Sequence, residues 1–390
     1  MDAVGQTRLP FELDVRAETA ALTAYGGVPL LIEAFRASGA AAVLDAAVVV
    51  KRRQRGLATS ELVEGLLALW ASGGERCEDL AQLREDAALA LLLGYAIPAP
   101  QTVRDFLEAF DEAAPPLWQG ERCAVLAEGE RLQGLAAGCR RLVAWLQERA
   151  PQARATIDVD ATILACQKQA ALPTYDGRTG YQPVVALWAE QDMVLADEFR
   201  DGNVPAGTGN RRVVEKAVAA LPPGVTEIRV RGDSALYEHD LLRWLDGRGI
   251  GYGISADLGR ELVAAIRALP EAAWREAGEE VQAIRHWAEV AYVPSDGVAT
   301  RDRPAPPRYL VLRVSQKQGG LFADGSTVRH FAVVTNLPDP AGGSGLDLIR
   351  WQRGKAGTIE HAHRVLKDEL AAAALPSGRF AANAAWFRLN

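Results

Sequence analysis

The sequence predicts a mixed α/β fold that follows an all-helical region, and two observations lead to this prediction. Apolar residues recur at helical spacing from residue 28 to about 150, and at about residue 153 the period changes to two. Strand-like and helix-like segments then alternate, which is typical of a mixed sheet covered by helices. We therefore expect a helical domain over 1–150 and a sheet-containing domain over 151–390, with a β-rich insertion at about 256–347.

The composition favours a soluble globular protein. Of the 390 residues, 49% are hydrophobic and 24% are charged, and the longest apolar run, at 40–50, is too short to cross a bilayer. The four cysteines show no zinc-binding spacing, so we expect reduced thiols and a cytoplasmic location without membrane contact. The net charge of −7 argues mildly against nucleic acid, although a local basic stretch such as Lys51–Arg55 can persist within that average.

The first region is interpreted as a series of helices separated by prolines. Apolar residues repeat at helical spacing in 30–35, 62–70 and 79–93, and Thr59-Ser60 is a candidate cap. Pro98 and Pro100 precede a helix capped by Gln101-Thr102, Pro115-Pro116 makes a second break, and a long helix covers 126–146. Two interpretations remain open: a helical domain without chemistry of its own, or a DNA-binding region whose arm is the basic stretch 51–55.

The second region alternates strands and helices. In Thr156–Thr162, Ile157 and Val159 fall on one face of a strand, and Asp158 and Asp160 fall on the other. The elements expected after it are strands at 180–188 and 193–199, a helix at 210–221, a strand at 227–233, a helix at 239–246 and a strand at 251–255. The insertion carries a helix at 261–269, an aromatic stretch at 281–293, and strands at 308–314 and 330–335.

A further amphipathic helix is expected after the turn Gly354–Gly357, with Thr358 as its cap. Glu360, Arg364 and Lys367 are spaced i, i+4 and i+7, so they share one face of a regular helix. One carboxylate beside two cations suits a site that holds a divalent metal and an anionic polymer together.

Asp160 and Asp233 each lie at the end of a predicted strand, and these two strands could be neighbours in the sheet. With Glu360 they would supply three hard oxygen ligands, as two-metal phosphoryl transfer requires. The strand period does not separate Asp158 from Asp160 as the first ligand. The plainer alternative is that each acid caps a helix or lies on the surface.

These residues resemble the DDE transposases of bacterial insertion sequences, in particular the insertion sequence 1380 group with its Tyr-Arg-Glu-Lys-like signature. The resemblance covers most of the chain and is carried by the segments 157–162, 180–183, 197–203, 231–234, 357–361, 375–380 and 383–387. It implies an RNase H-like core with the β-rich insertion before the glutamate helix. It also implies that the N-terminal helices recognise the transposon end.

The resemblance implies roles for individual residues. Asp160, followed by Ala161-Thr162, matches the first acid of the family, and Asp233 and Glu360 match the second and third. Together they would hold two Mg²⁺ ions, which Mn²⁺ could replace. Lys367 matches the lysine that contacts DNA phosphate, and Arg364 would assist it. The tyrosine and arginine positions of the signature hold Arg353 and Ala356, which leaves Trp351 and Lys355 as partial substitutes.

The resemblance thus predicts a bacterial, nucleoid-associated transposase. It would cut terminal inverted repeats and join them to target DNA, and it would act as a homodimer. Two alternatives stay open: a nuclease of the same fold without strand transfer, and an inert transposase-derived DNA-binding protein. The chain ends at Asn390 where relatives usually continue, so a truncated product is also an expectation.

Overall fold

The computed structural model describes residues 22–50, 56–279, 282–294, 306–317 and 321–390. The candidate DNA-contacting arm at 51–55 lies outside these residues. In the described part of the chain, no helix is long and apolar enough to cross a membrane. The chain divides into two compact units: Met1–Ala114 with Glu128–Leu142 and Leu366–Asn390, and Pro115–Ala127 with Val143–Val365. The domain boundary at about residue 150 stays a prediction.

The described residues of the first unit are mainly helical. Its core joins segments from both ends of the chain, because the buried rings of Trp70 and Trp386 meet edge to face with centroids 4.9 Å apart. The helices are α1 (Val28–Ala37), α2 (Ala40–Ala47), α3 (Thr59–Ala71), α4 (Leu80–Arg84), α5 (Ala87–Leu93), α6 (Pro100–Glu108), the first part of α7 (Glu130–Arg149), and α13 (Phe380–Leu389).

Two expected helix starts differ from the structure. Helix α7 begins at Glu130 rather than at residue 126, because β2 (Ala124–Leu126) pairs antiparallel with β1 (Pro116–Gln119). Helix α6 begins at Pro100, not after a Gln101-Thr102 cap. The fixed φ angle of proline and its missing N–H suit the first helical position, so Pro100 starts the helix rather than breaking the chain.

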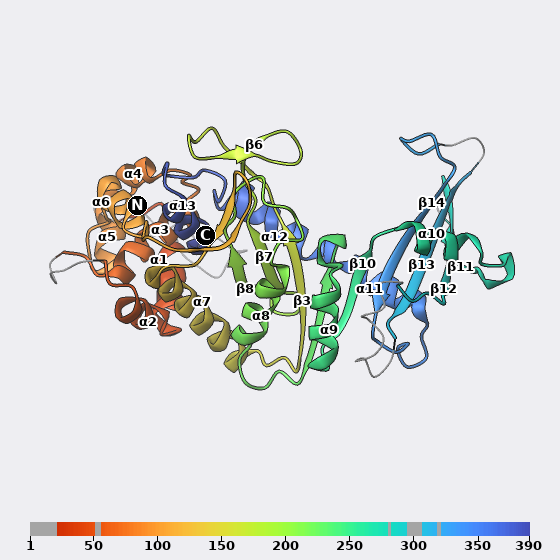
Figure 1. The fold of residues 1–390 in the computed structure, drawn as a ribbon. Coiled ribbons are helices and arrows are strands. Elements are labelled where there is room, and N and C mark those ends of the chain that lie inside the picture. The colour runs from red at the N-terminus through yellow and green to blue at the C-terminus, as the bar shows by residue number, and fades with distance from the viewer. Residues whose placement is uncertain (1–21, 51–55, 280–281, 295–305, 318–320) are drawn as a thin grey trace, which may run out of the picture. The chain divides into compact units, whose positions relative to one another are not determined.

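The second unit is built on a nine-stranded sheet with the order β11-β12-β13-β14-β10-β9-β3-β7-β8 (Figure 1). Strand β3 is parallel to β9, β9 is parallel to β10, and the other pairs are antiparallel. The bounds are β3 (Arg154–Ala161), β7 (Val184–Trp188), β8 (Met193–Glu198), β9 (Glu227–Gly232), β10 (Gly251–Ala256), β11 (Arg275–Glu279), β12 (Ala283–Val290), β13 (Arg308–Gln316) and β14 (Val328–Thr335).

This sheet confirms a mixed α/β fold. The β-rich segment continues the sheet, because β14 pairs with β10. A smaller sheet lies between β3 and β7 in sequence and consists of β4 (Leu164–Ala165), β6 (Thr179–Tyr181) and β5 (Leu172–Pro173).

Helices cover both faces of the large sheet. On one face, α8 (Asn210–Ala220), α9 (His239–Gly247) and α10 (Arg260–Arg267) share a hydrophobic core with Ile157 and Val159 of β3. On the opposite face, α11 (Gly345–Arg353) packs Leu348 and Ile349 against β12, β13 and β14. Because side chains alternate along a strand, Asp158 and Asp160 point to the face opposite Ile157 and Val159.

Candidate functional site

Asp160 and Asp233 lie at the ends of two adjacent parallel strands. Val159 of β3 is in register with Gly232 of β9, so the residues that follow each of them leave the sheet at the same edge. The expectation that these two strands are neighbours is therefore confirmed. A Cβ at Gly232 would lie 2.6 Å from Cδ2 of the buried Leu236, so any larger residue here would force that side chain to move.

Asp233 also caps the short turn Ser234–Leu236, where its Oδ1 accepts a hydrogen bond from the Ala235 N–H at 3.0 Å. Its pKa is raised, first by burial and then by the nearby negative charge of Asp160, while Lys355 acts in the opposite direction. The raised pKa of Asp233 reflects burial and a neighbouring negative charge, and a cation is favourable at such a place.

Lys355 supplies one positive charge at this pair. Its Nζ lies 3.3 Å from Oδ2 of Asp160, and the Lys355 and Asp160 side chains are 13% and 18% exposed. Oδ1 of Asp160 accepts from the N–H of Ala161 at 2.9 Å. Lys355 belongs to the short helix η5 (Gly354–Gly357), which follows α11. The sequence prediction had placed Lys355 among DNA contacts, and the structure places it against the carboxylate.

Asp158 has a different environment from Asp160. It is fully buried, and its two oxygens pair with Nε and Nη2 of Arg231 at 2.5 and 2.7 Å. The Thr358 hydroxyl also contacts Oδ2 of Asp158. Arg231 in turn donates from Nη1 to the Trp351 carbonyl at 2.6 Å. Asp158 is therefore engaged in joining β3, β9 and the end of α11.

Thr358 does not cap the next helix as expected. No side-chain cap hydrogen bond is present there, because its hydroxyl contacts Asp158 and donates to the Lys355 carbonyl at 3.1 Å. Helix α12 runs only from Ile359 to Arg364, and residues 365–369 form a π-helix. The regular spacing predicted from Glu360 to Lys367 is therefore interrupted.

Glu360 is exposed in the first turn of α12, whereas its neighbour Ile359 is fully buried. Helix α12 packs against β3, the strand that carries Asp160. Among the described residues, no group of three or more His, Cys, Asp or Glu side chains is placed to hold a metal. The structure thus brings Asp160, Asp233 and Lys355 together, and does not place Glu360 in a three-carboxylate cluster with them.

The other predicted DNA contacts are dispersed. The Trp351 ring lies beside the guanidinium groups of Arg231 and Arg229, at 5.4 and 5.7 Å from its centroid. The Arg353 guanidinium lies 5.2 Å from the Phe331 ring, and Nη2 of Arg364 lies 3.4 Å from Nδ1 of His361. Lys367 belongs to the first unit, within the π-helix.

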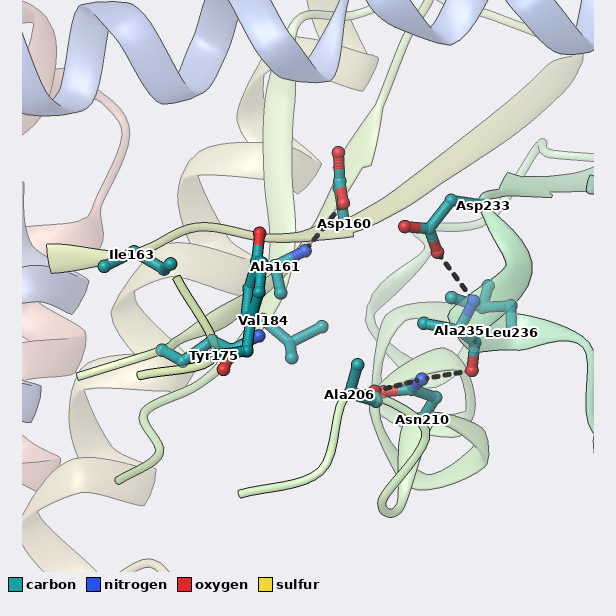
Figure 2. Close-up of a pocket in the computed structure, with 11 residues that line it drawn as sticks. Asp160, Ala161, Ile163, Tyr175, Val184, Ala206, Asn210, Asp233, Ala235 and Leu236 are labelled. Atoms are coloured by element: carbon teal, nitrogen blue, oxygen red, sulfur yellow. Dashed lines mark hydrogen bonds between the residues drawn. The ribbon is translucent and has the colours of Figure 1, made fainter. Parts of the chain in front are cut away.

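A cavity of about 200 Å³ is lined in part by the two aspartates, and sequence reasoning missed other residues that line it (Figure 2). Its lining includes Tyr175, Gln182 and Asn210 besides Asp160 and Asp233. Gln182 belongs to the Gly180–Pro183 segment that carried part of the resemblance. Nothing in the strand pattern of that segment gave a reason to single out the Gln182 amide. Tyr175 lies in a polar turn without any recognisable motif.

Two comparisons with known proteins found matches to this chain. The family model described as transposase DDE domain group 1 matches residues 10–390. A cryo-EM structure of the piggyBac transposase synaptic complex with hairpin DNA matches with a TM-score of 0.41 and 9% sequence identity, over 93% of this chain and 72% of that chain. No curated protein matches the chain.

Proposed function

The chain belongs to the transposase DDE domain group 1 family, and on that premise we propose that it cuts transposon ends and joins them to target DNA. The juxtaposition of Asp160 and Asp233 is the observation that carries the proposal. We assign the chain to a bacterial insertion sequence of the 1380 group, with an RNase H-like core. We also place it in the cytoplasm, in association with the nucleoid.

DDE transposases generally use divalent metals, and the donor set at this site fits such ions. Carboxylate oxygens are the ligands that Mg²⁺ prefers, and the mutual repulsion of Asp160 and Asp233 favours a bound cation. Asp160 and Asp233 would hold two Mg²⁺ ions, or Mn²⁺ in their place, with Glu360 as the third carboxylate. The ions would supply activation of the attacking oxygen and stabilisation of the leaving one.

Asp160 is assigned as the first ligand in preference to Asp158. Both oxygens of Asp158 accept hydrogen bonds from Arg231. If Asp158 bound a metal instead, the buried guanidinium of Arg231 would lose its carboxylate partner. Asp160 is 18% exposed, and its Oδ2 lies 3.3 Å from the flexible cation of Lys355. Arg231 and Thr358 position the segment before Glu360 by tying it to β3.

The proposed partners are the terminal inverted repeats and a target DNA. Lys367, Arg364, Arg353 and Lys355 would bind phosphates, with Trp351 packing against the backbone, and the helices before residue 150 would recognise the transposon end. Lys355 would substitute only in part for the arginine of the family signature, because lysine offers a single point charge whereas arginine can bind a phosphate with two hydrogen bonds. The active complex would be a homodimer.

The test is strand cleavage and strand transfer with Mg²⁺, on DNA that carries the inverted repeats flanking the gene. We expect nicks at the repeat ends and joining of the freed 3′ ends to a second plasmid, and we expect both to disappear in Asp160→Asn and Asp233→Asn. Cleavage without joining would indicate a nuclease of the same fold. Cleavage that survives both substitutions would contradict the proposed site.

One observation favours a second candidate, an inert DNA-binding protein derived from a transposase. In the described residues, Glu360 is exposed and does not join the two aspartates in a metal-binding group. This candidate predicts binding of the repeat ends without any metal-dependent cleavage. The same cleavage assay, run beside a gel-shift measurement on the repeat DNA, separates the two.

A further inference from the structure

The cavity beside the aspartates has the walls of a narrow slot. Tyr175 lines one side, and Ala206, Ala235 and Leu236 line the other, while Asp160 and Asp233 lie at its rim (Figure 2). Its volume of about 200 Å³ is smaller than the ~300–1,000 Å³ of a typical ligand pocket. An aromatic wall opposite an aliphatic one suits a small planar ring. We refer to this cavity as the Tyr175 slot.

Gln182 gives the Tyr175 slot a polar group without a partner. The residue is only 5% exposed, it lines the slot, and its side-chain amide makes no hydrogen bond with any described residue. Asn210 lines the same slot, but its amide is engaged, because Nδ2 donates to the carbonyls of Ala206 and Ala235 at 2.9 and 2.8 Å. The Gln182 amide is not among the described polar atoms that are buried without a partner, so it is reachable from the slot and can offer a donor and an acceptor to a ligand there.

Tyr175 is the second unusual feature, because 82% of this large aromatic residue is exposed. Its position is nevertheless fixed by a tight turn. The hydroxyl of Thr174 donates to Oδ1 of Asp176 at 2.6 Å, and Nε of Arg178 donates to Oδ2 at 2.7 Å. The turn closes with Gly177 at φ +84°, a conformation that favours glycine. A hydrogen-bonded turn thus carries the ring beside the slot.

We propose that the Tyr175 slot binds one unpaired nucleobase of a DNA strand. Tyr175 would stack on the face of the base, and the Gln182 amide would pair with a donor and an acceptor on its edge. The inference rests on the proposed function, which brings DNA to the aspartates. A base held in the slot would leave its sugar and phosphate at the rim. The slot therefore selects the nucleotide adjacent to the phosphate that reacts.

Photocrosslinking of the full chain tests where an unpaired base binds. The probe is a short duplex with a single-stranded overhang that carries iodouracil, which crosslinks to aromatic side chains on irradiation. We expect the principal adduct at Tyr175, located by mass spectrometry, and no adduct in the slot with the blunt duplex. An adduct that maps only to other residues would overturn the proposal.

Affinity measurements test the contribution of each wall. Base stacking on an aromatic ring predicts that Tyr175→Ala weakens binding of the overhang probe by roughly 5- to 150-fold, while the blunt duplex binds as before. Tyr175→Phe should retain the wild-type preference for the overhang. Leu258→Ala, which removes another exposed apolar side chain outside the slot, serves as the matched control and should change neither affinity.

Gln182→Met tests the hydrogen bonds at nearly constant side-chain volume. Wild-type protein should rank the four overhang bases by affinity, and Gln182→Met should bind them almost equally. If Tyr175→Ala and Gln182→Met both match wild type on every probe, the inference fails while the proposed function stands. If wild-type protein binds neither duplex, both the proposed function and this inference are wrong.

Discussion

Arg231 and Asp158 form a buried ion pair with two hydrogen bonds between neighbouring parallel strands. Nε lies 2.5 Å from Oδ1 and Nη2 lies 2.7 Å from Oδ2, and both residues are almost completely buried. The same guanidinium holds the Trp351 carbonyl at 2.6 Å. One arginine therefore links the strand that carries Asp160, the strand that precedes Asp233, and the chain that leads to Glu360.

The ion pair with Arg231 gives Asp158 a different role from Asp160, which is only two residues away. Asp158→Ala leaves a buried guanidinium without its partner, so we expect it to lower the free energy of unfolding by about 3 kcal/mol, measured by urea denaturation. Asp160→Ala removes the contact with Lys355 but also the repulsion of Asp233, so it should change stability less than Asp158→Ala does, while abolishing cleavage. If Asp160→Asn cleaves normally and only Asp158→Asn is inactive at full stability, the assignment of the first ligand is wrong.

The contact between Lys355 and Asp160 gives a prediction about metal affinity. A positive charge 3.3 Å from a ligand oxygen repels an incoming cation, so Lys355→Met should bind Mn²⁺ about fivefold more tightly, measured by electron paramagnetic resonance titration. Lys355→Arg keeps the charge and should bind Mn²⁺ like wild type. Lys317→Met, which also breaks a lysine ion pair, with Glu279, is the matched control. Equal tightening in Lys317→Met would contradict the prediction.

The sheet was predictable because its strands carry strong local patterns. Ile157 and Val159 alternate with Asp158 and Asp160, and that alternation correctly placed the acids on one face. The choice of Asp160 over Asp158 as the first metal ligand was not predictable, because the two-residue period of a strand places both side chains on the same face. It depends on Arg231, which is 73 residues away in sequence and becomes a neighbour only through the pairing of β3 with β9.

Elements governed by distant contacts were predicted less well. Thr358 has the residue type and position of a helix cap, but its hydroxyl contacts Asp158, 200 residues away. The helix after it changes to a π-helix at Val365, so the spacing that placed Lys367 beside Glu360 does not continue. Tyr175 and Gln182 could not be singled out, because their significance lies in an exposed ring and a free amide within one cavity.

Burial and the charge of Asp160 raise the pKa of Asp233, and this gives a pH prediction. The folded state binds the proton more tightly than the unfolded state, so Asp233 lowers stability as pH rises from its unfolded pKa through the higher folded pKa. Asp233→Asn keeps the capping function without the charge. In metal-free buffer it should therefore melt above wild type at pH 7, and the difference should vanish at acidic pH. A lower melting temperature at pH 7 would contradict this.

The buried acid Glu198 should show the opposite pH dependence. Burial acts to raise its pKa, but the hydrogen bonds from Arg212 and the charges of Arg200 and Arg212 outweigh burial, and the pKa is lowered. Its stabilising effect is therefore present above the unfolded pKa and is lost as pH falls through the folded one. Glu198→Gln should reduce the free energy of unfolding by about 3 kcal/mol at pH 7, with a smaller loss in acid. A loss independent of pH would indicate packing rather than charge.

Glu360 tests whether an exposed carboxylate on α12 has a chemical role. Because its side chain is exposed, Glu360→Gln should change the free energy of unfolding by no more than about 0.5 kcal/mol. If Glu360 is a metal ligand, this substitution should nevertheless lower the cleavage rate on the order of a hundredfold or more, since even the residues that only support metal ligands contribute ~10–100-fold.

The matched control is Glu276→Gln, at an exposed glutamate on β11. It makes the same chemical change away from the aspartates and should cleave like wild type. Normal cleavage by Glu360→Gln would remove the third carboxylate from the proposed site. A loss of cleavage with unchanged melting would instead show that α12 contributes Glu360 to the chemistry.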